Sequence, residues 1–171
     1  MPIHRLNHAV LYVRDADRSA DFYGSVLGFR RLPVPIPGAV FLQAEGSTND
    51  HDLGLFSIGE GAADSPAGRH AVGLYHLAWE VDTLTDLAEI GQKLSETGAL
   101  VGATDHGTTK AVYGRDPDGI EFEIAWIVPA DMITEDMGMR ARPLDLAKEI
   151  EHFGADTLGG IGVSRARPVD A

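Results

Sequence analysis

One pattern occurs twice in this chain, and it constrains the fold more than any other feature. In each copy, a short apolar segment that carries one histidine, His8 or His76, precedes a helical pattern and then several further apolar segments. The two histidines are 68 residues apart, and a valine follows each of them five residues later. Similarity at a fixed spacing indicates two copies of one structural unit. The sequence therefore predicts two β-α-β-β-β modules.

The hydrophobic periodicity and the turn residues place the elements of each module. The first module is predicted to contain a strand, a helix and three strands, at 6–13, 17–27, 29–34, 39–44 and 51–58. The second module repeats this order at 74–81, 84–94, 100–104, 110–114 and 120–127. Because one module leaves a sheet face uncovered, the two are expected to pair as a curved mixed sheet around one metal-centred cavity. The expected fold class is α+β.

The remaining chain is expected to be an extension of this domain. Residues 1–128 should form a single domain, with modules at about 4–58 and 72–128. Residues 129–171 contain one helical pattern at 143–153, with Pro143 near its first turn, and a glycine-rich stretch from Gly154. We therefore expect a C-terminal helix followed by a flexible tail.

Charge and composition narrow the possible functions. With 14 Lys and Arg against 26 Asp and Glu, the formal charge is −12, which repels nucleic acid and anionic membrane surfaces. No stretch approaches the roughly 20 apolar residues of a membrane helix, and the first residues are too polar for a signal peptide, so a cytoplasmic protein is expected. The chain has no cysteine, so a metal would be bound by nitrogen and oxygen.

Histidine and glutamate residues in the predicted strands are the candidates for a metal site. A single histidine in a strand is usually an ordinary core or surface residue, but His8 and His76 occupy equivalent positions of two modules expected to pack together. The last strand adds Glu121 and Glu123, which share one face because side chains alternate. That face is also compatible with simple solvation, and alternation does not distinguish the two glutamates. Either one would complete a two-histidine, one-carboxylate set that leaves coordination positions open, as in non-haem Fe(II) oxygenases.

Together these features resemble the vicinal oxygen chelate superfamily. The resemblance covers roughly residues 4–128 and rests on the two modules and on the segments LNHAV, YHLA and RDPDG, at 6–10, 75–78 and 115–119. This superfamily includes extradiol dioxygenases, glyoxalase isomerases, epimerases, thiol transferases and metal-free antibiotic-binding proteins. The fold alone therefore does not define the function.

Several residues resemble those of the catechol 2,3-dioxygenase branch in particular. The resemblance implies Fe(II), with Mn(II) as a second possibility, bound by His8, His76 and Glu123. It also implies that His51 is the acid–base group of the active site. Tyr113 and His106 would form hydrogen bonds to the bound diol.

The activity implied by this resemblance is cleavage of a small aromatic diol by O2, in a protein that forms homo-oligomers. A metal-dependent isomerase, epimerase or thiol transferase is the main alternative. Glyoxalase-like members usually place a fourth, carboxylate ligand in the strand of His51, where Asp52 is the nearby candidate but should face away from His51. A metal-free protein that binds a small molecule is the third possibility.

Overall fold

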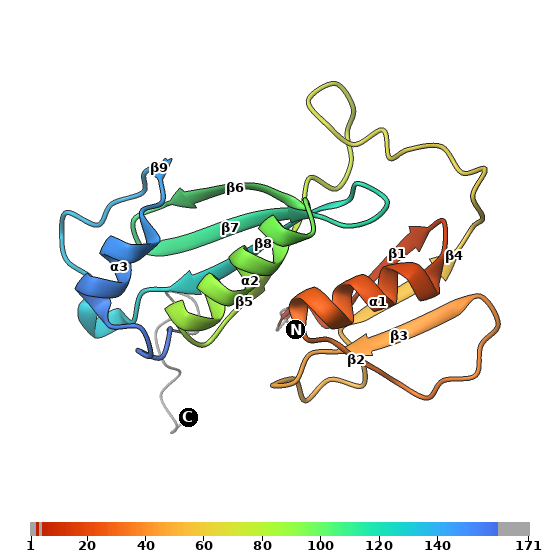
Figure 1. Ribbon diagram of the computed structural model, residues 1–171, viewed down its shortest axis with the longest axis horizontal. Coiled ribbons are helices and arrows are strands. Elements are labelled where there is room, and N and C mark those ends of the chain that lie inside the picture. The colour runs from red at the N-terminus through yellow and green to blue at the C-terminus, as the bar shows by residue number, and fades with distance from the viewer. Residues whose placement is uncertain (1–2, 4, 161–171) are drawn as a thin grey trace. The chain divides into compact units, whose positions relative to one another are not determined.

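The computed structural model describes residue 3 and residues 5–160, which divide into two compact units (Figure 1). Unit 1 contains the described residues up to Gly73 together with Arg115–Ile120. Unit 2 contains Leu74–Gly114 and the described residues from Glu121 onward. Each unit has a mixed sheet and at least one helix, which confirms the predicted α+β class and the repeat of the β-α-β-β-β order.

Unit 1 is a four-stranded sheet with one helix against it. Its elements are β1 Ala9–Val13, α1 Ala16–Leu27, β2 Arg30–Arg31, β3 Ala39–Gln43 and β4 Leu53–Ser57. The strand order is β1-β4-β3-β2, with β1 parallel to β4 and the other pairs antiparallel. The helix begins after Asp15, whose carboxylate accepts hydrogen bonds from two backbone amides, and ends at Gly28 with φ of 77°. Both ends agree with the sequence pattern.

The segment 115–119 is a structural part of unit 1. Asp118 accepts hydrogen bonds from the backbone amide and the guanidinium of Arg14, at 3.1 and 2.8 Å. The buried Tyr23 hydroxyl donates to Asp116 at 3.2 Å. Burial, with the charge of Asp116, raises the pKa of Tyr23 well above its ordinary value. Asp116 and Asp118 therefore hold the 115–119 turn against the N-terminal part of unit 1 that contains Arg14 and α1.

Unit 2 repeats the arrangement and adds the extension. Its elements are β5 Leu77–Glu80, α2 Leu84–Glu96, β6 Leu100–Asp105, β7 Thr109–Arg115, β8 Glu121–Ile127, η1 Ala130–Met132, β9 Arg142–Pro143 and α3 Leu146–Phe153. The strand order is β5-β8-β7-β6-β9, with β5 parallel to β8 and β6 antiparallel to both neighbours. Three apolar side chains of β8 are buried on the helix side of the sheet: Phe122, Ile124 and Trp126.

The helix of the extension ends at Phe153 as predicted, but it begins later than the expected Pro143. Pro143 lies in β9, opposite Thr104, and α3 begins three residues later because the Asp145 carboxylate accepts a hydrogen bond from Lys148. The Trp126 indole donates to the carbonyl of Thr157 at 3.1 Å. The backbone amides of Gly159 and Gly160 donate hydrogen bonds to the carbonyls of Asp82 and Ile127. The rest of the expected tail, 161–171, lies outside the described residues.

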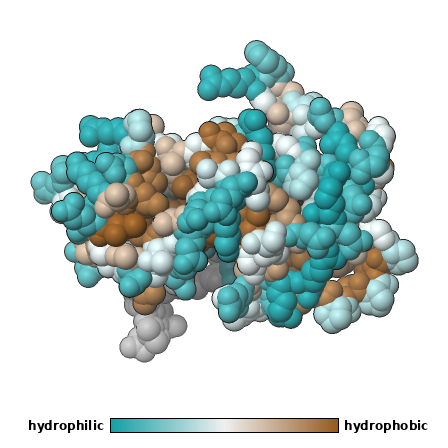
Figure 2. All heavy atoms as spheres, viewed as in Figure 1, coloured by the Kyte–Doolittle hydropathy of each residue, from teal (hydrophilic) through white to brown (hydrophobic). Residues whose placement is uncertain are grey.

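The surface carries both polar and apolar side chains. In the face shown in Figure 2, hydrophilic residues cover much of the molecule, and apolar residues lie between them. Among the described residues, no helix is long and apolar enough to cross a membrane.

Candidate functional site

A pocket of about 570 Å³ lies on unit 2. Four residues predicted from the sequence line it, namely His76, His106, Tyr113 and Glu123. Tyr75 and Glu121 are also part of its wall, and the described residues that line it include no lysine or arginine. The strands of unit 2 therefore gather imidazole, phenol and carboxylate groups around one cavity.

Strand pairing explains why His76 and Glu123 meet. Ala78 of β5 lies opposite Glu123 of β8 in a parallel pair, and His76 precedes Ala78 by two residues. Side chains two residues apart in an extended segment share a face. His76 and Glu123 therefore lie on the face opposite the buried Phe122 and Ile124, as the alternation of β8 predicts.

These two residues contact each other through a ring nitrogen and a carboxylate oxygen, both of which are atoms that could bind a metal ion. His76 Nε2 lies 3.1 Å from a carboxylate oxygen of Glu123, and their side chains are 26% and 13% exposed. Neighbouring ligands about 2.1 Å from an octahedral ion are about 3.0 Å apart. The Nδ1 atom of His76 is buried with no hydrogen-bond partner. Of the two glutamates left open by the sequence, Glu123 makes this contact.

Tyr113 and His106 form a hydrogen-bonded pair in the same pocket. His106 Nε2 lies 2.8 Å from the Tyr113 hydroxyl, and His106 Nδ1 lies 3.1 Å from the carbonyl oxygen of Arg140. A carbonyl only accepts, so in a neutral imidazole Nδ1 carries the proton and Nε2 accepts from Tyr113. Burial, followed by the negative charge of Glu123, raises the pKa of Tyr113 to about 12. At neutral pH the Tyr113 side chain is a phenol.

A cluster of charges that was not predicted from the sequence lies beside this pair. Asp105 is buried and accepts hydrogen bonds from Lys110 at 2.6 Å, from the backbone amide of Gly107 at 2.8 Å and from Arg140 at 2.8 Å. Burial alone would raise the pKa of Asp105, but these hydrogen bonds outweigh it and lower the pKa to about 2. Lys110 lies within the apolar pattern of β7, and a buried ammonium requires a partner. This lysine was the feature of the sequence from which the cluster could have been predicted.

Unit 1 contains the other two predicted residues, His8 and His51. Their ring centroids are 4.4 Å apart, and the ring of Phe41 lies 5.1 Å from that of His51. His8 Nδ1 lies 2.7 Å from the amide oxygen of Asn7. Since this oxygen accepts, Nδ1 donates and the lone pair of Nε2 remains available, which is the arrangement of a metal-binding histidine.

The Asp52 side chain is hydrogen-bonded to the loop that precedes it. Its buried carboxylate accepts hydrogen bonds from the amide of Ala44 at 2.8 Å, the hydroxyl of Ser47 at 2.8 Å and the side chain of Asn49 at 2.7 Å. Asn49 in turn donates to the carbonyl of Asn7 at 2.8 Å. Asp52 therefore stabilises the loop and, through Asn49, the segment that carries His8.

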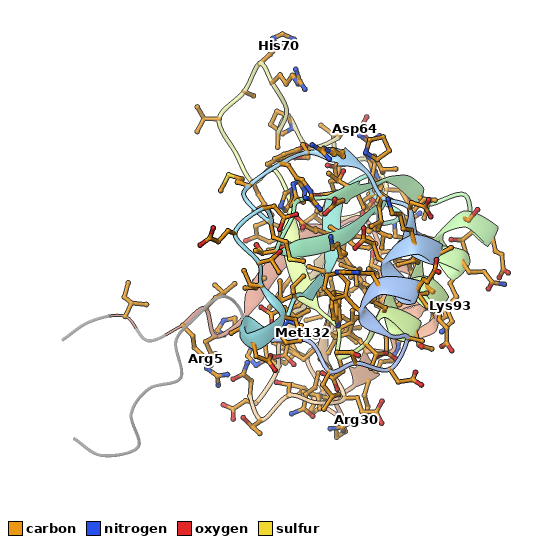
Figure 3. The ribbon with its side chains drawn as sticks, turned by 90° about the vertical axis from the view of Figure 1, so that its left-hand side faces the viewer. Arg5, Arg30, Asp64, His70, Lys93 and Met132 are labelled. Carbon is orange, nitrogen blue, oxygen red and sulfur yellow. The ribbon has the colours of Figure 1, made fainter. Side chains whose placement is uncertain are left out.

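The predicted metal ligands are divided between the two units. His8 belongs to unit 1, whereas His76 and Glu123 belong to unit 2. No group of three histidine, aspartate or glutamate side chains suited to a metal ion occurs among the described residues. His70, which the sequence analysis did not select, is exposed on the segment between β4 and β5 (Figure 3).

A family model decides the relationship that the fold suggests. The model for the Glyoxalase/Bleomycin resistance protein/Dioxygenase superfamily matches residues 5–124. The chain belongs to this superfamily. The match spans both modules, and the C-terminal extension with α3 lies beyond it.

The members of the superfamily that resemble this chain include both dioxygenases and a lyase. A catechol-2,3-dioxygenase of Bacillus subtilis is 30% identical over 70% of this chain, which spans only 40% of that protein. A biphenyl-2,3-diol 1,2-dioxygenase of Rhodococcus globerulus is 32% identical over 70% of this chain and 62% of its own length. A lactoylglutathione lyase of Neisseria meningitidis is 31% identical over 70% of this chain and 88% of its own.

Solved structures agree with the fold. A glyoxylase/bleomycin resistance protein/dioxygenase domain from Frankia sp. EAN1pec has a TM-score of 0.60 at 23% identity, over 72% of this chain and 92% of that chain. A lactoylglutathione lyase from Agrobacterium tumefaciens has a TM-score of 0.54 at 26% identity, over 73% of this chain and 95% of that chain. The superfamily thus holds both dioxygenases and lyases at similar distances from this protein.

Proposed function

We propose that this protein is an Fe(II)-dependent extradiol dioxygenase that cleaves a catechol-like aromatic diol with O2. The observation that supports this proposal best is the pairing of two features in one pocket. His76 and Glu123 present nitrogen and oxygen donors 3.1 Å apart, and Tyr113 and His106 present a hydrogen-bonding pair beside them. A metal ion bound by His76 and Glu123, beside a pair that can bind a hydroxyl group, would suit a ligand that offers two oxygens.

The donor set fits a metal that prefers nitrogen and oxygen. We propose His8 as the third ligand, because its Nδ1 is already hydrogen-bonded and its Nε2 lone pair is available. Two histidines and one carboxylate favour Fe(II), and Mn(II) shares this preference. The chemistry that such an ion supplies is chelation of the diol oxygens and activation of O2.

The remaining residues of the site would handle the protons of the substrate. We assign His51 as the acid–base group, since a histidine takes up and releases protons near neutral pH. The contact with the Phe41 ring restricts where the His51 ring can lie. Tyr113 remains a phenol at neutral pH, so it would hold a substrate oxygen by a hydrogen bond rather than act as a base.

A glyoxalase-type isomerase is the second candidate, and the relationship to lactoylglutathione lyases favours it. Two observations weigh against it. Asp52, the candidate for a fourth ligand, directs its carboxylate to Ala44, Ser47 and Asn49. Among the described residues, the lining of the unit 2 pocket includes no lysine or arginine to pair with an anionic adduct.

Oxygen consumption separates the two candidates. The full chain would be loaded with Fe(II) without oxygen and tested against monocyclic catechols, fused-ring diols and hydroquinones in an oxygen electrode. We expect uptake in proportion to the loss of one of the vicinal diols, with a ring-opened product. Isomerisation of a hemithioacetal with no oxygen uptake on any diol would support the second candidate instead.

A further inference from the structure

The C-terminal extension reaches the pocket of unit 2 at one point, between Met137 and Ala141. Ala141 lines the pocket. The backbone of Met137 and Gly138 lies directly on Gly107, because a Cβ atom at Gly107 would be 2.5 Å from the Gly138 carbonyl oxygen. The extension is therefore packed against the turn that follows His106.

Arg140 joins this part of the extension to two groups at once. Its guanidinium lies on one carboxylate oxygen of Asp105, with Nε at 2.8 Å and a terminal nitrogen at 2.7 Å. Its backbone carbonyl faces Nδ1 of His106 at 3.1 Å. Together with the hydrogen bond from the Arg140 backbone amide to the His106 carbonyl at 3.4 Å, the ion pair holds the main chain of Arg140 where its carbonyl can receive the imidazole proton.

Asp105 is fixed from its other side as well. The ammonium of Lys110, which is 1% exposed, lies 2.6 Å from the second oxygen of Asp105 and 3.0 Å from Glu149 of α3. The same ammonium lies 5.5 Å from the ring centre of Phe153. Because each charge in this cluster has an opposite charge in contact, Asp105 offers Arg140 a stationary anchor.

We propose that Arg140, anchored by Asp105, is a positioning residue that fixes His106 as the Nδ1–H tautomer. Nε2 of His106 is then an acceptor for the hydroxyl proton of Tyr113. The carboxylate beside Tyr113, that of Glu123, also only accepts when ionised. With its proton directed to one of these groups, Tyr113 offers lone pairs to the pocket and selects a ligand oxygen that carries hydrogen.

This selection deepens the proposed function and rests on it. A hydroxyl oxygen donates a hydrogen bond and a carbonyl oxygen does not. A pocket that offers an acceptor at Tyr113 therefore favours a ligand that places a hydroxyl, such as one of a diol, at this position. Arg140 lies outside the strands of the repeat, so this preference is a contribution of the C-terminal extension.

The tautomer of His106 can be measured without any substrate. The metal-free, nitrogen-15-labelled full chain would be examined at mildly alkaline pH by long-range proton–nitrogen correlation, with His106→Gln to assign the signals. We expect a protonated Nδ1 and a bare Nε2 at His106. In Arg140→Ala the two ring nitrogens should shift toward the averaged values of a mobile imidazole, and Arg140→Lys should restore part of the difference.

Arg142→Ala is the matched control, because Arg142 is an exposed arginine two residues further along the same segment. It should leave the His106 signals unchanged. A protonated Nε2 in the unaltered protein, or equal changes in both alanine variants, would overturn the proposal. Since no turnover is involved, these outcomes are separate from the oxygen test. If diol cleavage is found, Arg140→Ala should lower kcat by about tenfold with the iron content retained.

Discussion

Glu121 and Glu123 lie two residues apart on the same face of β8, and Glu123 contacts Nε2 of His76 at 3.1 Å. At the scale of single residues, this contact is the observation from which we propose Glu123, and not Glu121, as a metal ligand. It also makes the choice between the two carboxylates testable by a pair of matched substitutions.

Glu123→Gln should weaken Fe(II) binding by more than about tenfold, because even the outer partners of metal ligands are worth 10–100-fold in affinity. Glu121→Gln should bind Fe(II) nearly as the unaltered protein does. Anaerobic titration with Fe(II), followed by determination of bound iron per chain, measures both. Loss of iron in the Glu121 variant with retention in the Glu123 variant would reverse the assignment.

At the scale of elements, the turn between β6 and β7 depends on a single glycine. Gly107 has φ of 89°, and a Cβ atom there would lie 2.5 Å from the carbonyl oxygen of Gly138. Both the backbone conformation and the close approach exclude a side chain. The contact partner, Gly138, has open space at the corresponding position.

Gly107→Ala should therefore lower the free energy of unfolding by about 2 kcal/mol or more, since strain and a backbone clash add. Gly138→Ala should change it by less than about 1 kcal/mol. Urea denaturation followed by tryptophan fluorescence is suited to this comparison, because Trp79 and Trp126 both lie in unit 2. Equal losses in the two variants would show that the extension does not press on this turn.

Local signals were sufficient to predict most of the elements. Asp15 and Gly28 mark the ends of α1 by their own chemistry, and the buried face of β8 follows from alternation. Pro143 was misleading, because the cap that starts α3 is Asp145 and the proline pairs in β9.

Four residues that line the unit 2 pocket were predicted from the sequence, but the contacts that hold them in place were not. The repeat identified His8 and His76, and the choice of Glu123 came from the family resemblance. The contact of Arg140 with Asp105 joins residues 35 positions apart, and no periodicity connects them. Asp52, an apparent ligand candidate in the sequence, proved to hold a loop because its hydrogen-bond partners come from residues 44–49.

At the scale of the whole molecule, the Asp105 cluster links the stability of unit 2 to pH. The pKa of Asp105 is about 2, below the ordinary 3.8, because Lys110, Gly107 and Arg140 outweigh the effect of burial. A lowered carboxyl pKa contributes stability at neutral pH that is lost as the pH falls from about 3.8 toward 2. The contribution is roughly 2 kcal/mol.

Arg140→Ala removes one cation from Asp105, so the pKa of this carboxyl should rise toward its ordinary value. The acid-induced loss of stability should then begin at higher pH than in the unaltered protein. Urea denaturation at a series of acidic pH values, followed by tryptophan fluorescence, would show this shift. The exposed Arg142→Ala should reproduce the unaltered profile, and identical profiles in all three proteins would contradict the role given to Arg140.

The proposed function requires that this protein insert oxygen into a vicinal diol. The most direct test is turnover of the Fe(II)-loaded full chain under oxygen-18 gas, with mass spectrometry of the product formed from the diol that supports oxygen uptake. The proposed function predicts a ring-opened product that carries both atoms of one O2 molecule. Conversion of the substrate without incorporation of label, or an intact ring carrying one labelled atom, would contradict it.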